Sequence, residues 1–290
     1  MTRSSAATSR LSVLQASTVA GLEVLHRAGA GPTVVALPGL GSSAWAWESL
    51  AEAAPDLDLY AISLAGRGGS HAVKGAKGLE GHARMVAAVV EELGLEDVVV
   101  VGHSMGAYLA PLVAQQLNGR VKHLVLVDGG IRPAFPFFMS AGLTRMVFRS
   151  QLKKARGPFP TIEAVLKKAR VGPMLADRPE LTPQIIRMLD RELGGTPGAR
   201  TALTDVERCA DDAADTFFGP TFEPALAALT VPAYVILAEN AKKAGQKPFI
   251  SDARVKTAVA QQPLLTKVTR LTGNHITVVF EPEVIEAIRA

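Results

Sequence analysis

The sequence predicts an α/β protein with an open, doubly wound and mostly parallel sheet, into which a helical cap is inserted. Short β-branched runs alternate with helical patterns along most of the chain, which implies parallel strands joined by right-handed crossovers. The runs "VVVV" at 98–101 and "LVLV" at 124–127 are apolar without alternation, as strands buried on both faces are. The strand rhythm stops after Gly130 and returns only near residue 232, which indicates the insertion.

These patterns predict six strands and two helices. The strands are expected at 33–39, 57–64, 97–103, 122–129, 232–240 and 266–273, and the helices at 79–93 and 104–117. The segment 131–220, rich in Phe, Pro, Lys and Arg, is expected to form the helical cap, which leaves 18–130 and 221–290 for the sheet core. The polar start "MTRSSAATSR" lacks the apolar centre of a secretory signal, so residues 1–17 are expected to be a flexible tail.

Length and composition fit a globular protein. The chain has 290 residues, of which 48% are apolar and 20% charged, and it is long enough to bury a substantial core. No apolar run is long enough to cross a bilayer, and the single cysteine, Cys209, cannot form an intramolecular disulfide. We therefore expect a soluble protein of a reducing compartment, the cytoplasm, and leave its oligomeric state open.

The basic residues are concentrated in one part of the chain. The net charge is only +4, but residues 131–170 hold nine Lys or Arg against Glu163 alone. Arg145, Arg149 and Lys153 recur every four residues and would form one stripe on a helix. The expected role of this stripe is a solvated face, and contact with a membrane surface is not expected; attraction of anionic substrates or lipid headgroups is the alternative. No recognition motif accompanies the charge, so we expect no nucleic-acid partner.

A serine lies at the joint between a buried strand and a helix. Gly102 and Gly106 flank Ser104 two residues away on either side, in "GHSMG". A tight turn needs small neighbours there, because larger ones would force the helix into the strand. The turn directs the serine toward a helix N-terminus, where backbone N–H groups favour developing negative charge. This position suits a nucleophile; the alternative is an ordinary turn with a serine cap.

The ordered motifs "ALPGLGSSAWAW", "SLAGRGGS", "VGHSMGA", "LVLVDGG" and "TGNH" resemble the α/β-hydrolase superfamily. The resemblance covers nearly the whole chain except the tail and the cap. It implies a nucleophile, an acid and a histidine on loops at the carboxyl edge of the sheet, and an oxyanion hole made of two backbone amides.

The resemblance assigns three of these roles directly. Ser104 is the nucleophile, and His275 in "TGNH" is the general base that a serine hydroxyl needs at neutral pH. His103 is expected to point away from the serine and to have a structural role. The amides of Leu40 and Met105 are expected to form the oxyanion hole. "GLGS" lacks the pattern of a phosphate loop, so no nucleotide is expected.

The acid departs from the commoner pattern of the family. In most members it follows the strand that corresponds to 232–240, but here that strand continues "ENAKKAGQK", and the position near Ala241 has no carboxylate. Asp128, at the end of the strand after the nucleophile's helix, is the better candidate. Haloalkane dehalogenases and fungal zearalenone lactonases are similar in placing the acid there. Glu239 is the second candidate and Asp252 the third.

A serine nucleophile restricts the reaction. Dehalogenases and epoxide hydrolases of this superfamily use an aspartate, so Ser104 leaves acyl chemistry. Several aromatic and apolar residues could line a substrate pocket, or could pack the cap onto the core instead: Trp45, Phe135, Phe137, Phe138, Met139, Phe148, Phe217 and Phe218.

Two functions remain open. The first is a serine hydrolase, without cofactor or metal ion, that cleaves an ester or lactone of a hydrophobic small molecule. Such an enzyme would be a carboxylesterase or a lactonase, with a zearalenone-type aromatic lactone as one case. The second is a non-catalytic ligand-binding protein on the same fold.

Overall fold

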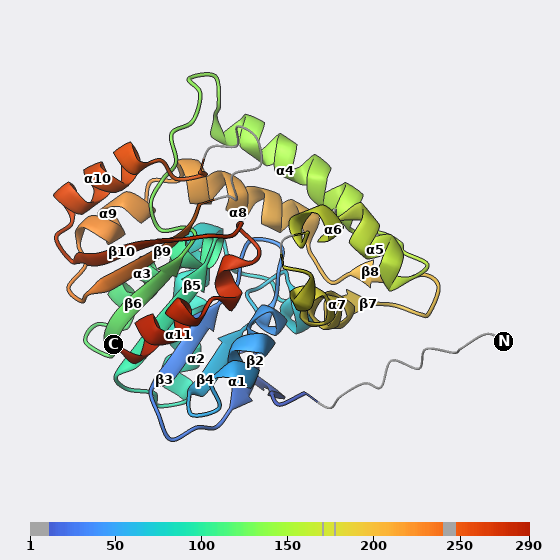
Figure 1. Cartoon of the computed structure of the whole chain (residues 1–290), viewed down its shortest axis with the longest axis horizontal. Coiled ribbons are helices and arrows are strands. Elements are labelled where there is room, and N and C mark those ends of the chain that lie inside the picture. The colour runs from blue at the N-terminus through green and yellow to red at the C-terminus, as the bar shows by residue number, and fades with distance from the viewer. Residues whose placement is uncertain (1–11, 170, 177, 240–247) are drawn as a thin grey trace.

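The computed structural model describes residues 12–239 and 248–290, except residues 170 and 177 (Figure 1). The first eleven residues of the expected tail and the position near Ala241 lie outside the described residues. An eight-stranded sheet has the order β1-β2-β4-β3-β5-β6-β9-β10, and every pairing from β4 to β10 is parallel. The predicted doubly wound α/β fold is confirmed. The strands are β1 (Gln15–Val19), β2 (Leu22–Arg27), β3 (Thr33–Leu37), β4 (Asp58–Ile62), β5 (Val98–His103), β6 (Val121–Val127), β9 (Ala233–Ala238) and β10 (Leu265–Leu271).

The sequence patterns missed the first two strands. β1 and β2 pair antiparallel with each other, and β2 pairs antiparallel with β4. Four of the five residues of β1 are exposed, so the strand has no continuous apolar run of the kind that marks the central strands. The expected flexible tail, 1–17, is therefore wrong at its end, because the sheet begins at Gln15.

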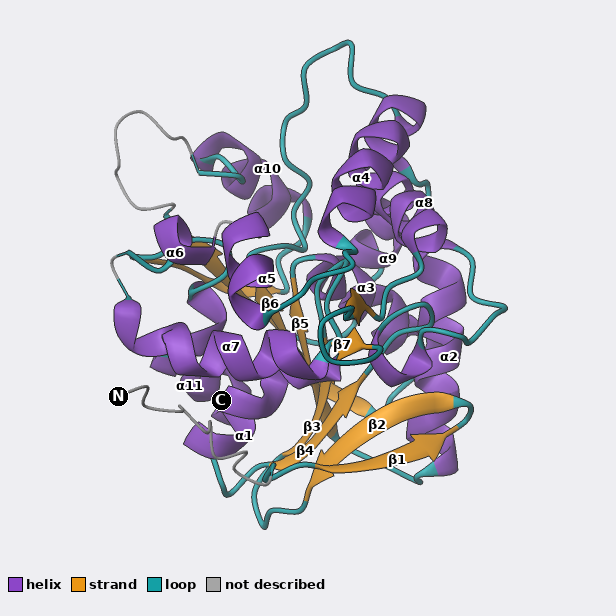
Figure 2. Cartoon of the chain, turned by 90° about the vertical axis from the view of Figure 1, so that its right-hand side faces the viewer, coloured by secondary structure: helices purple, strands orange, loops and turns teal. Residues whose placement is uncertain are grey.

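Helices cover both faces of the sheet (Figures 1 and 2). Alternate residues of β5 serve the two layers: Val98 and Val100 face one apolar cluster, and Val99 and Val101 face the other. The first layer holds α2 (Gly78–Glu92), α3 (Met105–Gln116), α9 (Phe222–Ala227) and α10 (Asp252–Gln261); the second holds α1 (Glu48–Ala53) and α11 (Pro282–Arg289). Single 3-10 turns lie at Ala44–Trp47, Gly68–Ser70, Pro179–Leu181 and Val278–Phe280.

Helices predominate between residues 131 and 220. They are α4 (Ala141–Ala155), α5 (Ile162–Lys168), α6 (Val171–Met174), α7 (Thr182–Arg191) and α8 (Val206–Phe218), together with a small hairpin of β7 (Leu193–Gly194) and β8 (Thr201–Ala202). One apolar cluster of this segment includes Ile276 and Phe280, which follow β10. The segment therefore packs on the loop that carries His275.

The basic stripe on α4 faces another helix. Arg145 and Arg149 both pair with Glu207 of α8, at 3.0 and 2.6 Å, and Arg145 also pairs with Asp211. Figure 1 shows α4 and α8 side by side. Two of the three stripe residues thus bridge helices, in addition to contacting solvent. Among the described residues, no helix is both long enough and apolar enough to span a membrane.

Candidate active site

The turn that carries Ser104 has a backbone that only small neighbours permit. Ser104 sits between β5 and α3 at φ 53° and ψ −118°, a strained conformation for a residue with a side chain. A Cβ atom on Gly102 would lie 2.2 Å from the Gly106 carbonyl oxygen, and one on Gly106 would lie 2.3 Å from the Leu37 carbonyl oxygen. The two glycines let the helix approach the strands β3 and β5 closely, which agrees with the steric reason for expecting them.

Ser104, His275 and Asp128 lie together at the carboxyl edge of the sheet. Nε2 of His275 is 3.0 Å from the Ser104 hydroxyl oxygen, and Nδ1 of His275 is 2.6 Å from Oδ2 of Asp128. The Asp128 side chain is 2% exposed, and the imidazole is 40% exposed, so the ring joins a buried carboxylate to an accessible hydroxyl. The structure thus brings together three residues that come from the ends of β5, β6 and β10.

The Asp128 carboxylate is held on its other side by β9. The Ala238 amide donates to Oδ1 at 3.0 Å, and the Asp128 amide donates to the Ile236 carbonyl at 2.7 Å. Oδ2 is left for the imidazole. Of the alternative acids, Asp252 pairs with Arg270 at 2.7 Å. Glu239 makes no hydrogen bond or ion pair with His275 in the described structure.

His103 contacts the loop that carries His275. Its Nε2 lies 2.8 Å from the His275 carbonyl oxygen. Burial, and then the neighbouring His275, lower the pKa of His103 to about 3, so the ring is neutral near pH 7. A neutral ring bonded in this way carries its proton on Nε2 and donates it to the carbonyl. The expected structural role thus becomes a specific one, because His103 anchors the backbone of the histidine that contacts Ser104.

The two backbone amides expected to form an oxyanion hole are both available. Leu40 and Met105 line the cavity beside Ser104. Within residues 12–239 and 248–290, neither amide donates to a backbone or side-chain acceptor. Met105 is the first residue of α3, where unpaired amides favour a negative charge.

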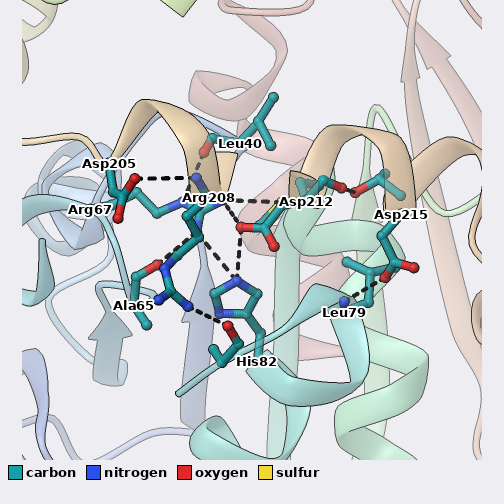
Figure 3. Close-up of polar contacts among 12 residues, drawn as sticks. Leu40, Ala65, Arg67, Leu79, His82, Asp205, Arg208, Asp212 and Asp215 are labelled. Atoms are coloured by element: carbon teal, nitrogen blue, oxygen red, sulfur yellow. Dashed lines mark hydrogen bonds and ion pairs between the residues drawn. The ribbon is translucent and has the colours of Figure 1, made fainter. Parts of the chain in front are cut away.

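A buried arginine donates to the carbonyl oxygen of Leu40, in the peptide that follows the Leu40 amide (Figure 3). Arg67, which is fully buried, donates from Nε to the Leu40 carbonyl oxygen at 2.8 Å and from Nη1 to the Ala65 carbonyl oxygen at 2.8 Å. Its Nη2 pairs with Oδ2 of Asp212, on α8, at 2.7 Å. Arg67 therefore connects the loop of Leu40 with a helix of the segment 131–220. This role was not predictable from the sequence, because only the position within "SLAGRGGS" marked Arg67 and nothing marked Asp212.

His82 completes the buried cluster. Its Nε2 lies 2.9 Å from Oδ2 of Asp212, and burial lowers the pKa of the ring, which favours neutral His82 donating to the carboxylate. Burial alone would raise the pKa of Asp212, but the hydrogen bond from His82 and the charge of Arg67 lower it overall. Neither this cluster nor any other in the described part of the chain groups three His, Cys, Asp or Glu residues suited to a metal ion.

Two adjoining cavities meet at Ser104 and share Leu40, Phe148 and His275. The first, the aromatic lobe, has a volume of about 360 Å³ and is lined by these residues with Met105, Tyr108, Ala213, Thr216, Phe217 and Phe249. The second, the Glu192 lobe, has a volume of about 460 Å³ and contains Glu192 with Ser42, Gln151, Ile185, Met188, Leu189 and Phe280 among its lining residues.

The five residues expected to bind substrate line neither lobe. Phe137 and Phe138 are 101% and 62% exposed, on the loop before α4, and Met139 lies on the same loop. Phe135 packs behind the pocket wall against Phe217 and Phe218, with ring centroids 5.3 and 5.1 Å apart, and Trp45 packs under the Arg191 guanidinium. Aromatic composition alone could not separate these positions from Phe148 and Phe217, which do line a lobe, because helix orientation decides which side chains face Ser104.

Comparison with known proteins identifies similar chains. The family model described as "Alpha/beta hydrolase family" matches residues 34–288. The protein named "Putative carbamate hydrolase RutD" of Azorhizobium caulinodans is 28% identical over 245 residues, which cover 78% of this chain and 82% of that protein.

Two solved structures share the fold. An E-2-(acetamidomethylene)succinate hydrolase has a TM-score of 0.74 at 19% identity, with 96% of this chain and 100% of that chain covered. A thermophilic esterase from Thermogutta terrifontis has a TM-score of 0.66 at 21% identity, with 95% and 97% covered. At these identities the structures support the fold alone. The family model extends over nearly all of β3, over every later strand of the sheet, over the segment 131–220 and over the loops that hold Ser104, Asp128 and His275. The chain therefore belongs to the alpha/beta hydrolase family.

Proposed function

We propose that this hydrolase is a serine enzyme that cleaves an ester or lactone of a hydrophobic small molecule through an acyl-enzyme. One observation carries the proposal: the imidazole of His275 lies between the Ser104 hydroxyl, at 3.0 Å, and the Asp128 carboxylate, at 2.6 Å. This arrangement gives a weak nucleophile a base, and gives the base a group that fixes its tautomer.

The reaction follows from these contacts. Nε2 of His275 takes the Ser104 proton as the serine oxygen attacks the substrate carbonyl, and the amides of Leu40 and Met105 donate to the oxyanion that forms. His275 then gives the proton to the leaving alcohol, and the acyl group stays on Ser104. A water molecule, deprotonated by the same imidazole, attacks the acyl carbon. The bond to the Ser104 oxygen then breaks as His275 returns the proton to that oxygen, and the acid is released. Asp128 accepts the hydrogen bond from Nδ1 of His275 and stabilises the imidazolium that forms in both halves of the reaction.

The cavities support a hydrophobic substrate. Aromatic and aliphatic side chains dominate the lining of both lobes, and Ser104 lies where the lobes meet. A small ester or lactone with an apolar group on each side of the carbonyl would fit such a site. The lactone case, including a zearalenone-type lactone, is supported only by the placement of Asp128 after β6. The similarity to RutD adds carbamates as substrates to test.

The direct test is turnover of a panel of p-nitrophenyl esters, aryl lactones and aryl carbamates by the wild-type protein and by Ser104→Ala. We expect hydrolysis of at least one apolar ester or lactone, and a fall below about a thousandth of that rate in the variant, since losing a triad nucleophile typically costs more than this. A folded Ser104→Ala variant that keeps wild-type turnover would contradict a serine mechanism.

The alternative is a non-catalytic ligand-binding protein. A fluorophosphonate probe separates the two functions, because it labels only an activated serine. Labelling of wild-type protein that is absent from Ser104→Ala favours the enzyme, whereas no labelling and no turnover would favour a binding protein.

A further inference from the structure

We propose that Glu192 forms a polar subsite beside Ser104 that binds a hydrogen-bond donor on the substrate, with a protonated amine held most tightly. The inference rests on the proposed function, and it narrows the substrate to a molecule that is apolar near its scissile bond and carries a donor at one end.

The Glu192 carboxylate is held in place by Ser42 and Ser43 at the lobe that Ser104 also lines. Glu192 follows α7 and lines the lobe that Ser104 and His275 also line. Its Oε1 accepts hydrogen bonds from the Ser42 hydroxyl at 2.6 Å, the Ser43 amide at 2.7 Å and the Ser43 hydroxyl at 2.9 Å. Three donors on one oxygen fix the orientation of the carboxylate, so its position does not depend on a ligand.

The other oxygen of the Glu192 carboxylate, Oε2, is the atom that would bind the ligand. Within residues 12–239 and 248–290, Oε2 of Glu192 has no hydrogen bond and no ion pair, and it is not among the polar atoms sealed from solvent. The side chain is only partly exposed, and its residue lines the lobe. Oε2 therefore has no protein partner among these residues, and the residue that carries it borders a concave site, where a ligand donor could bind it.

Glu192 places an ionisable side chain among mostly apolar residues of the lobe. Aliphatic and aromatic side chains such as Ile185, Met188 and Phe280 form much of the remaining wall. Burial raises the pKa of Glu192, and the hydrogen bonds from Ser42 and Ser43 only partly oppose this effect. A carboxylate in such surroundings gains more from a cation than one in water does, because the local dielectric constant is lower.

A purely structural role for Glu192 would give different behaviour. By binding Ser42 and Ser43, the carboxylate also tethers the loop of Leu40, so its removal can slow the hydrolysis of every ester. The selectivity between esters with the same reacting group separates the roles, since a displaced loop lowers all rates together whereas a lost subsite lowers only the rate of the donor-bearing substrate.

The experiment compares butyrate esters of three para-substituted benzyl alcohols, with aminomethyl, hydroxymethyl or ethyl groups. A second series places the same groups on the acyl side. In one of the two series, we expect kcat/KM for the aminomethyl ester to exceed that for the ethyl ester by about tenfold or more, the range of a charge-assisted hydrogen bond. Glu192→Gln should bring this ratio to within about twofold, because it keeps an acceptor but removes the charge.

Two control variants accompany Glu192→Gln. Glu163→Gln makes the same chemical change on an exposed residue of α5 that lines neither lobe, and it should leave the ratio unchanged. Ser42→Ala removes one donor to Oε1 but keeps the carboxylate, so it should lower the rates without lowering the ratio. A ratio that stays high in Glu192→Gln, or a wild-type protein without preference in either series, overturns the subsite.

A binding measurement makes the inference independent of turnover. Calorimetry with Ser104→Ala would compare 4-(aminomethyl)benzyl alcohol with 4-ethylbenzyl alcohol, in the presence and absence of Glu192→Gln. We expect Glu192→Gln to weaken binding of the amine about tenfold or more and to leave the ethyl compound unaffected. Amine binding that Glu192→Gln does not weaken contradicts the subsite. If the amine binds as expected but wild-type protein hydrolyses no ester, the proposed function fails and the subsite stands.

Discussion

The orientation of His275 depends on single residues on both sides of its ring. Asp128 receives the Ala238 amide on one oxygen and His275 on the other, while His103 holds the His275 carbonyl at 2.8 Å. Asp128 also has a positive φ of 44°, which is uncommon for a residue with a side chain and is tolerated where surrounding bonds fix the backbone. Both the ring and its loop are therefore held in place before a substrate arrives.

The first prediction concerns the acid. Asp128→Asn keeps the size of the side chain but supplies an amide that can stabilise the wrong imidazole tautomer, so kcat should fall by about two to four powers of ten with little change in KM. Steady-state kinetics on the best ester of the panel measures this. Glu239→Gln is the matched control and should have a mild effect, and the reverse order of the two variants would move the acid to the strand β9.

The second prediction uses the pKa of His103. Because the folded pKa is about 3 and the ordinary value is 6.5, the unfolded chain binds a proton between these pH values that the folded chain does not. The contribution of His103 therefore lowers the free energy of unfolding as the pH falls below about 6.5, by up to about 1.4 kcal/mol per pH unit. Urea unfolding between pH 6 and 4 should show a shallower loss of the free energy of unfolding in His103→Gln. If the free energy of unfolding falls equally steeply with pH in the two proteins, His103 binds protons equally in the folded and the unfolded chain.

The sequence could predict the role of a residue when nearby residues in the sequence mark that role. Ser104 is marked by glycines within two positions, and Asp128 and His275 stand at the ends of recognisable strands. Arg67 could not be assigned, because its partner Asp212 belongs to a distant helix with no motif of its own. The same reason hid Glu192, whose contacts with Ser42 and Ser43 arise only when α7 packs over the loop of Leu40.

Among the elements, the turn from β5 to α3 places the strictest steric demand on the fold. α3 starts beside β3 and β5, so that a Cβ atom on either flanking glycine would lie within 2.3 Å of a carbonyl oxygen. The central strands and the turn at Ser104 were predictable, since burial on both faces and close packing leave a pattern in the sequence. β1 and β2 were not predicted, because an edge hairpin with an exposed strand needs no apolar run.

The third prediction tests the close packing of this turn. Gly106→Ala should lower the free energy of unfolding by about 1–3 kcal/mol and reduce turnover, because a backbone oxygen cannot move away as a flexible side chain could. Gly142→Ala is the control, since nothing lies within 4 Å of its added Cβ atom on α4. It should stabilise the protein by about 0.5–1 kcal/mol. Thermal and urea unfolding of both variants would check the contrast, and equal effects would contradict the steric account.

In the molecule as a whole, the segment 131–220 is joined to the loop of Leu40 by one fully buried ion pair and by partly buried hydrogen bonds. Asp212 on α8 binds Arg67, which holds the Leu40 carbonyl, and Glu192 after α7 binds Ser42 and Ser43. The loop of Leu40 is thus held by contacts with α8 and with the end of α7, as well as by its connection to β3. Substrate recognition by this segment and stabilisation of the oxyanion are therefore expected to be coupled.

The fourth prediction concerns this coupling. Asp212→Asn removes the counter-charge of the fully buried Arg67 and should lower the free energy of unfolding by about 3 kcal/mol or more. It should also lower kcat more than it raises KM if the Leu40 amide donates to the oxyanion, as we propose. Glu207→Gln breaks only exposed pairs with Arg145 and Arg149, and should change both quantities little. Comparable effects of the two variants on stability and kcat would show that the buried cluster has no special role.

Mass spectrometry would detect an acyl-enzyme on Ser104. The intact protein would be quenched in acid during turnover of its best ester and then mapped by peptides. We expect one added acyl group, on the peptide that contains Ser104. Asp128→Asn should leave the adduct on the same serine and slow both its formation and its decay. Ser104→Ala should form no adduct. An acyl-enzyme on Ser104 would be contradicted by an adduct on another residue of the active wild-type protein. It would also be contradicted by undiminished turnover in a folded Ser104→Ala variant.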